Sequence, residues 1–197
     1  MALISLVVLK LFFRLDVKGR QNIPSEGPII LAANHFSIID PWVLQVSCPR
    51  RIIYMVEDEY YQSWGWWFYR MHRAIPVKTG GFNKEAVVTG LKALKNNSVL
   101  GIFPEGWGEE VDGKVGQGSA GVAMLSCKSR APVLPIYIDG VYEALPKGAI
   151  LPRFTRVTVK YGKPIRCDTA KKPDKETLRR MTDEIMDKIR ELAKNGE

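Results

Sequence analysis

The chain has few cysteines, few histidines and no apolar run long enough to cross a membrane. Its cysteines, Cys48, Cys127 and Cys167, are widely spaced and form no C-x-x-C pair. This argues against a disulfide scaffold and a zinc site, and it suits a reducing compartment. A G-x-S-x-G motif is missing as well, so no serine stands out as a nucleophile. No repeat or linker divides the sequence, and we expect a single domain over residues 1–197.

The first 13 residues, MALISLVVLKLFF, are apolar apart from Lys10. As a helix they would measure about 20 Å, against about 30 Å for the hydrocarbon core of a bilayer. No small-residue cleavage site follows, so a signal peptide is not expected. A short apolar helix either packs in a core or against a partner, or it inserts into one leaflet with Lys10 and Arg14 at the head groups. We predict the second, a membrane-associating segment over residues 1–13.

Basic residues outnumber acidic ones. The chain has 29 Lys and Arg against 21 Asp and Glu, which gives a net charge of +8 and a pI near 9.4. Such a surface favours anionic partners, whether phospholipid head groups, nucleic acid or phosphorylated small molecules. The interleaved aromatics or zinc framework of a nucleic-acid module are missing, so nucleic acid is not an expected partner. A membrane surface is the partner that we expect.

Short apolar runs alternate with helix-like segments along the chain. The predicted strands cover residues 27–33, 51–56, 74–77, 99–103, 133–138 and 156–161. Helices are predicted from Asp40, over 60–68, 83–95 and 120–127, and from Asp174, where an amphipathic C-terminal helix carries one apolar stripe. This alternation predicts an α/β fold with a mostly parallel central sheet flanked by helices. Functional residues should lie in loops beyond the strand ends.

One of the two histidines, His35, directly follows the first long predicted strand. Asp40 comes five residues later and opens a predicted helix as its N-cap, with Pro41 at N1. If its carboxylate binds one ring nitrogen of His35, the tautomer is fixed and the other nitrogen can act as a base. Without a protein nucleophile, such a pair suits removal of a proton from a substrate hydroxyl. In the alternative interpretation, Asp40 only caps the helix and His35 is a satisfied loop residue.

Three short motifs follow one another along the chain. They are N-H-x₄-D-P at residues 34–41, F-P-E-G at 103–106 and A-P-V-L-P-I at 131–136. In this order and spacing they resemble the glycerolipid acyltransferase family, which includes 1-acylglycerol-3-phosphate acyltransferases. The similarity extends from about residue 13 to residue 165.

The resemblance implies an O-acyltransferase that moves a fatty acyl group from acyl-CoA or acyl-carrier protein to a lipid hydroxyl. By default the acceptor is 1-acyl-sn-glycerol-3-phosphate (lysophosphatidate), the product is phosphatidate, and no metal or redox cofactor takes part. In this family the histidine is the base and the aspartate orients it, and these roles fall on His35 and Asp40. Substrate contacts are predicted for Asn34, Glu105, Gly106, Trp107 and Lys78.

The chain departs from the family pattern in two of its blocks. The third block commonly reads E-G-T-R, whereas residues 105–108 read E-G-W-G. The second block usually ends in an arginine, whereas this chain has Thr79 there and Lys78 one place earlier. Those arginines are credited with holding the acceptor phosphate, a task that suits a planar guanidinium. The acceptor is therefore lysophosphatidate, with Lys78, Arg73 or Lys114 compensating as a point charge, or it is a sugar, an amino-acid lipid or another hydroxylated lipid. Trp107 would pack against a sugar ring or an acyl chain, or it is a core residue without a role in substrate choice.

Two further signals bear on rival functions. Residues 116–121, GQGSAG, match G-x-G-x-x-G, and Asp139 lies 18 residues beyond Gly121, in the outline of an NAD-binding fingerprint. A polar stretch rather than a strand precedes them, so we expect a tight loop near the acceptor site instead. The aromatic cluster at 64–68 either anchors at a membrane interface or fills the core, and we favour the core.

An inactive lipid-binding homologue is a third class of function. The interpretation favoured by all these observations is an acyltransferase held peripherally or monotopically at the cytoplasmic face of a membrane.

Overall fold

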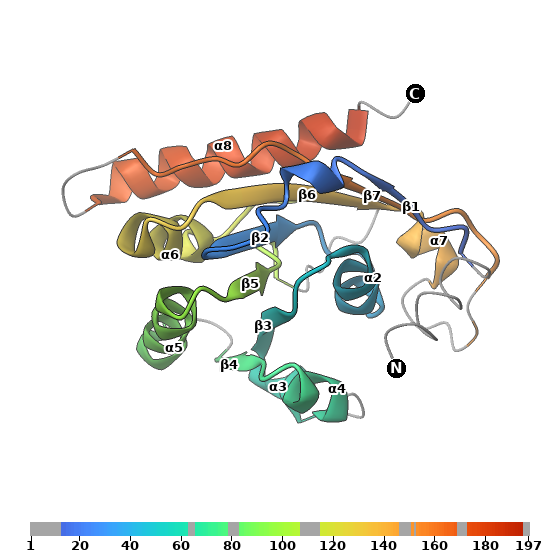
Figure 1. Ribbon diagram of the computed structural model, residues 1–197, viewed down its shortest axis with the longest axis horizontal. Coiled ribbons are helices and arrows are strands. Elements are labelled where there is room, and N and C mark those ends of the chain that lie inside the picture. The colour runs from blue at the N-terminus through green and yellow to red at the C-terminus, as the bar shows by residue number, and fades with distance from the viewer. Residues whose placement is uncertain are drawn as a thin grey trace.

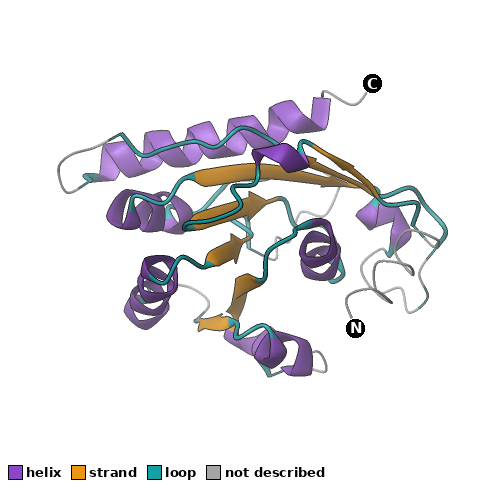
Figure 2. Ribbon diagram, in the orientation of Figure 1, coloured by secondary structure: helices purple, strands orange, loops and turns teal. Residues whose placement is uncertain are grey.

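In the computed structural model the described residues form one sheet with helices on both faces (Figures 1 and 2). They are residues 13–62, 66–78, 83–106, 115–145, 151, 153–168 and 173–194. The strands are β1 (Asp16–Lys18), β2 (Ile29–Ala33), β3 (Ile52–Glu57), β4 (Ile75–Val77), β5 (Val99–Ile102), β6 (Val133–Asp139) and β7 (Thr158–Tyr161). The helices are η1 (Arg20–Asn22), α2 (Asp40–Ser47), α3 (Asp58–Tyr61), α4 (Trp66–Met71), α5 (Lys84–Lys95), α6 (Gly121–Ser129), α7 (Val141–Ala144) and α8 (Lys175–Lys194).

The strand order is β1-β7-β6-β2-β5-β3-β4. Every neighbouring pair is parallel except β6 and β7, which confirms the mostly parallel sheet. β2 lies between β6 and β5, and all five of its residues are fully buried. A strand covered on both faces is apolar throughout, which explains why the run before His35 shows no alternation.

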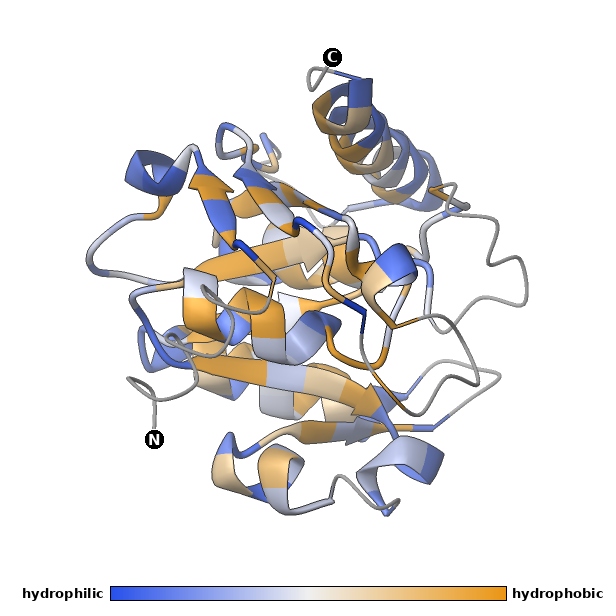
Figure 3. Ribbon diagram, turned by 90° about the vertical axis from the view of Figure 1, so that its right-hand side faces the viewer, coloured by the Kyte–Doolittle hydropathy of each residue, from blue (hydrophilic) through white to orange (hydrophobic). Residues whose placement is uncertain are grey.

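The longest helix, α8, lies across β6 and beside α6, which in turn contacts α5 (Figure 1). α2 lies on the opposite side of the sheet from α5 and α6. The apolar stripe of α8 is buried through Met181, Ile185 and Ile189, while its charged residues face outward (Figure 3). As predicted, Asn83 caps α5, because its side chain accepts a hydrogen bond from Ala86 N at 3.1 Å.

Gly101 in β5 is a glycine because its neighbour β3 leaves no room for a side chain. A Cβ there would lie 2.7 Å from Ile52 and 2.9 Å from the ring of Tyr54. The Tyr54 hydroxyl in turn donates a hydrogen bond of 2.6 Å to the carbonyl of Pro41. The close approach of β3 and β5 thus fixes the first turn of α2.

The expectation that the cysteines form no disulfide is wrong. Cys127 of α6 is joined to Cys167, with the two Cα atoms 5.0 Å apart, whereas Cys48 is free and buried. The two partners are 40 positions apart in sequence and gave no local signal, because only the folded sheet brings α6 next to the segment that follows β7.

The aromatic cluster at residues 64–68 is predicted to fill the core. Within the part of the cluster that the structure describes, this prediction is wrong for the two tryptophans. The side chains of Trp66 and Trp67 are 50% and 47% exposed, and Phe68 is the member that packs against the core. His72, which directly follows α4, is buried, with its ring centroid 4.5 Å from that of Phe68.

The predicted apolar N-terminal helix lies outside the described residues, apart from Phe13, which is buried. Among the helices that the structure does describe, none has the length and apolar character needed to span a bilayer.

Candidate active site

His35 and Asp40 are brought together by the loop between β2 and α2. The helix begins at Asp40 with Ile39 as its N-cap, one residue earlier than predicted. The Asp40 side chain turns back into the loop, where its Oδ2 accepts hydrogen bonds of 2.7 Å from the backbone N–H groups of Phe36 and Ser37. The same oxygen lies 2.8 Å from Nδ1 of His35. An ionised carboxylate only accepts, so Nδ1 carries the proton in this pair.

The carboxylate that holds His35 is removed from water. The Asp40 side chain is fully buried, whereas that of His35 is 12% exposed. Three N–H groups at one carboxylate oxygen give charge-assisted hydrogen bonds, which compensate for its removal from water. Oδ1 of Asp40 is buried without a hydrogen-bond partner in the described part of the chain. The aspartate therefore holds one edge of the imidazole in a fixed tautomer.

The face of the His35 ring contacts Phe103, which directly follows β5. The ring centroids are 4.2 Å apart and the planes differ by 21°. Phe103 also lies parallel to Tyr54, with centroids 6.4 Å apart. The imidazole is thus restrained by an aromatic stack as well as by its carboxylate.

Glu105 and Gly106 lie in the turn after β5, the parallel neighbour of β2. Because Ala32 pairs with Ile102, the ends of both strands meet at one edge of the sheet. Glu105 accepts a hydrogen bond of 2.9 Å at Oε2 from Gly116 N, and its Oε1 is buried without a described partner. Gly106 has a φ of +67°, a left-handed conformation that favours glycine.

Burial is the main reason why the pKa of Glu105 is raised above its ordinary value of 4.5. The Gly116 N–H and the electrostatic influence of His35 and Arg190 act in the opposite direction, and the charge of Asp40 raises the pKa further. These groups lie close enough to Glu105 to act on its charge, so it shares one electrostatic environment with His35 and Asp40.

The glycine-rich segment forms a loop beside Glu105. Ser119 N donates to the carbonyl of Pro104 at 2.8 Å, and a Cβ on Gly118 would lie 2.7 Å from Met186 of α8. The nearest described strand before this segment is β5, which ends at Ile102. The strand that an NAD-binding fingerprint requires directly before its first glycine is therefore not found in the described residues.

The other predicted substrate contacts are distributed differently. The Asn34 amide is buried and committed to β6, since it donates to the carbonyl of Ile138 at 2.9 Å and accepts from its N–H at 2.7 Å. Lys78 is exposed after β4, which β3 separates from β5. Trp107 lies outside the described residues. Contact of these three residues with substrate stays a prediction.

The motifs did not point to Arg190. This residue of α8 donates a hydrogen bond of 2.7 Å from Nη2 to the carbonyl of Gly116, on the other side of the loop from Glu105. Its position in an amphipathic helix is typical of a solvated basic face, so no local pattern connects it with the β5 turn.

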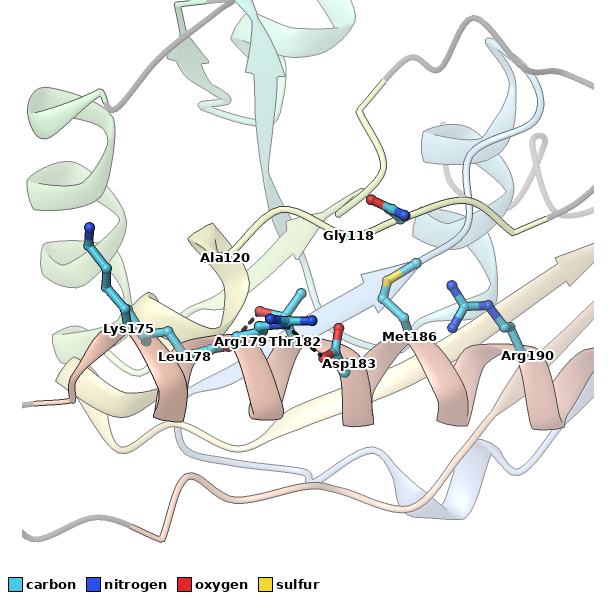
Figure 4. Close-up of a pocket in the computed structure, with 10 residues that line it drawn as sticks. Gly118, Ala120, Lys175, Leu178, Arg179, Thr182, Asp183, Met186 and Arg190 are labelled. Carbon is cyan, nitrogen blue, oxygen red and sulfur yellow. Dashed lines mark hydrogen bonds and ion pairs between the residues drawn. The ribbon is translucent and has the colours of Figure 1, made fainter.

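A groove of about 640 Å³ lies between α8 and the glycine-rich loop (Figure 4). Leu178, Thr182 and Met186 line its middle, and Lys175 and Arg190 lie at its two ends. Arg190 therefore connects the groove with the turn that carries Glu105.

The chain is similar to known proteins in sequence and in fold. The model of the acyltransferase family matches residues 14–139. The 1-acyl-sn-glycerol-3-phosphate acyltransferase of Bacillus subtilis (strain 168) is 28% identical over 189 residues, which are 94% of this chain and 92% of that protein. The chloroplastic 1-acyl-sn-glycerol-3-phosphate acyltransferase BAT2 of Brassica napus is 26% identical over 144 residues, 70% of this chain but 41% of that protein.

A solved structure is similar over almost the whole chain. The 1-acyl-sn-glycerophosphate (LPA) acyltransferase PlsC from Thermotoga maritima has a TM-score of 0.76 and 25% sequence identity, and the match covers 98% of this chain and 78% of that one.

Proposed function

Because the chain belongs to the acyltransferase family and is an O-acyltransferase, we propose that it acylates the free hydroxyl of lysophosphatidate. The donor is a fatty acyl thioester of CoA or of acyl-carrier protein, and the product is phosphatidate. The observation that carries the proposal is the 2.8 Å contact between His35 Nδ1 and the buried Oδ2 of Asp40.

The proposed reaction begins at the ring nitrogen of His35 that Asp40 does not hold. Nε2 takes the proton from the acceptor hydroxyl while the hydroxyl oxygen attacks the thioester carbonyl. The tetrahedral intermediate collapses, the C–S bond breaks, and the leaving thiolate takes the proton back from the imidazolium. Asp40 stabilises the imidazolium while it exists. No metal or redox cofactor is needed in this sequence of steps.

Direct transfer is supported by the state of Ser37 and of the three cysteines. Ser37 Oγ donates to the carbonyl of Leu145 at 3.0 Å. Cys127 and Cys167 are joined in a disulfide, and Cys48 is buried, which raises the pKa of its thiol. An acyl-enzyme intermediate on one of these residues is therefore not part of the proposal.

Glu105 and Gly106 are proposed to contact the acceptor. They follow the strand next to β2, and their turn carries the Phe103 ring that lies against His35. We further propose that the protein works at a membrane surface. Its net charge of +8 favours anionic head groups, and Trp66 and Trp67 offer exposed amphipathic rings of the kind found at bilayer interfaces.

The test is release of free thiol from acyl-CoA or from acyl-carrier protein by the purified full chain, followed with a thiol reagent. Each donor is offered alone, with lysophosphatidate, with monoacylglycerol and with a glycolipid, and the lipid products are identified by mass spectrometry. The proposal expects release that depends on lysophosphatidate and yields phosphatidate. Thiol release without any acceptor, or acylation of the glycolipid alone, would contradict it.

A further inference from the structure

The groove along α8 has a cation at the end nearest Glu105. Arg190 lies there, and Lys175 lies at the opposite end of the same helix face (Figure 4). The Arg190 guanidinium donates to the Gly116 carbonyl at 2.7 Å, while the N–H of Gly116 donates to Glu105 at 2.9 Å. A single loop residue thus links the guanidinium with the turn after β5.

The Arg190 guanidinium makes one hydrogen bond to the backbone and one to an exposed side chain, and the second can be replaced by a hydrogen bond to a ligand. Its second hydrogen bond runs from Nη1 to Asp187 Oδ1 at 2.8 Å, between side chains that are 38% and 66% exposed. Such exposed ion pairs are weak, so an incoming anion with more charge displaces Asp187 readily. The Gly116 carbonyl still fixes the position of the group. A guanidinium has five N–H donors, and its planar fork matches two oxygens of a phosphate.

We infer that Arg190 binds the phosphomonoester of the acceptor lipid at this end of the groove. The inference rests on the proposed function and deepens it by naming a residue that selects a phosphorylated acceptor. It supplies from the C-terminal helix the guanidinium that residues 105–108 and Lys78–Thr79 do not provide.

The neighbouring carboxyl groups are compatible with a phosphate here. Glu105 uses Oε2 for the Gly116 N–H, so its hydrogen bond is made to the loop and not to Arg190. Asp183, which also lines the groove, pairs with Arg179 at 3.8 Å, one helical turn from Met186 and away from the loop end. Asp187 is then the carboxylate that competes directly for Arg190.

The test compares Arg190→Gln with the wild-type chain in steady-state kinetics with acyl-CoA and lysophosphatidate. We expect KM for lysophosphatidate to rise about 10-fold or more, the usual consequence of losing hydrogen bonds to a charged group. KM for acyl-CoA should not change. Arg190→Lys should recover part of the loss, because lysine keeps the charge but not the fork.

Two further variants make the comparison specific. Arg180→Gln removes an exposed arginine of the same helix that is not among the residues lining the groove, and it should leave KM for lysophosphatidate unchanged. Asp187→Asn removes the competing carboxylate and should lower that KM.

Direct binding separates this inference from the proposed reaction. In the His35→Ala background, equilibrium binding of short-chain lysophosphatidate should weaken with Arg190→Gln, whereas binding of the matching monoacylglycerol should not. If the wild-type chain transfers no acyl group, the proposed function fails, and the binding measurement still decides about Arg190. Equal effects of Arg190→Gln and Arg180→Gln, a change in KM for acyl-CoA instead, or a fall in kcat alone would overturn the inference.

Discussion

The ring of His35 stacks on the ring of Phe103, with centroids 4.2 Å apart. His35 follows β2 and Phe103 follows β5, two strands that are parallel neighbours in the centre of the sheet. This contact joins the loop of the N-H-x₄-D-P motif to the loop of the F-P-E-G motif. Asp40 holds the edge of the imidazole and Phe103 holds its face.

The stacking predicts that Phe103→Leu lowers kcat by about 2-fold to 10-fold, the range expected when an aromatic contact is lost but bulk is kept. The reason is that the imidazole gains freedom about the Asp40 hydrogen bond. Initial rates at saturating substrates measure the effect. Phe68→Leu, which changes a ring that contacts Tyr54 without contacting His35, is the matched control. Equal rates for Phe103→Leu and the wild-type chain would show that the stack does not orient the base.

Glu105 predicts a pH dependence of stability. Burial raises its pKa in the folded chain above the ordinary 4.5, so the folded state binds this proton more tightly than the unfolded state. The free energy of unfolding should therefore fall as the pH rises from 4.5 through the raised pKa. Glu105→Gln removes this loss, so it should be more stable than the wild-type chain above that window and equally stable below it.

Denaturant unfolding at a series of pH values measures the difference, and Glu59→Gln at an exposed position is the control. A constant offset between Glu105→Gln and the wild-type chain at every pH would show that Glu105 is not the group responsible.

The disulfide predicts that a reductant destabilises the protein. Closing a loop between Cys127 and Cys167, which are 40 positions apart in sequence, stabilises a fold by about 4 kcal/mol in the chain-entropy model. Urea unfolding with and without dithiothreitol should reveal a loss of that size. The Cys127→Ala/Cys167→Ala double variant should already be destabilised and show no response to the reductant, whereas Cys48→Ala should respond as the wild-type chain does. Identical curves for the wild-type chain in both conditions would count against the bond.

The exposed tryptophans predict a contribution to membrane binding. Trp66 carries the Arg70 guanidinium 5.6 Å from its ring centroid, so a cation accompanies the aromatic surface. Replacing Trp66 and Trp67 with alanine should weaken sedimentation with vesicles that contain anionic lipid, without lowering the melting temperature. Val88→Ala, which changes an exposed apolar residue of α5, serves as the control. Unchanged sedimentation would restrict membrane association to other parts of the chain.

The sheet and the His35–Asp40 pair were predictable because their signals are local. Apolar runs such as residues 29–33 mark strands covered on both faces. The five-residue spacing brings Asp40 back to His35, because a helix that begins at the aspartate can turn its side chain toward the preceding loop. The resemblance to a family then placed Glu105 in the same site.

The features that were missed depend on contacts between distant segments. Cys127 and Cys167 meet because α6 and the segment after β7 pack on the same sheet, and the spacing in sequence does not show this. Arg190 reaches Gly116 only because α8 folds across β6. Trp66 and Trp67 are large apolar residues of the kind that usually lie in a core. The helix α4 that carries them has only six residues and precedes the edge strand β4, so it does not bury them.

The central claim is tested most directly by the rate at which lysophosphatidate and acyl-CoA form phosphatidate, measured for the wild-type chain, His35→Gln and Asp40→Asn. If one imidazole steered by one carboxylate removes the hydroxyl proton, kcat should fall by about 10²-fold to 10⁴-fold in both variants while they remain folded. If either folded variant forms phosphatidate at the wild-type rate, the pair is not the base, and the account is wrong.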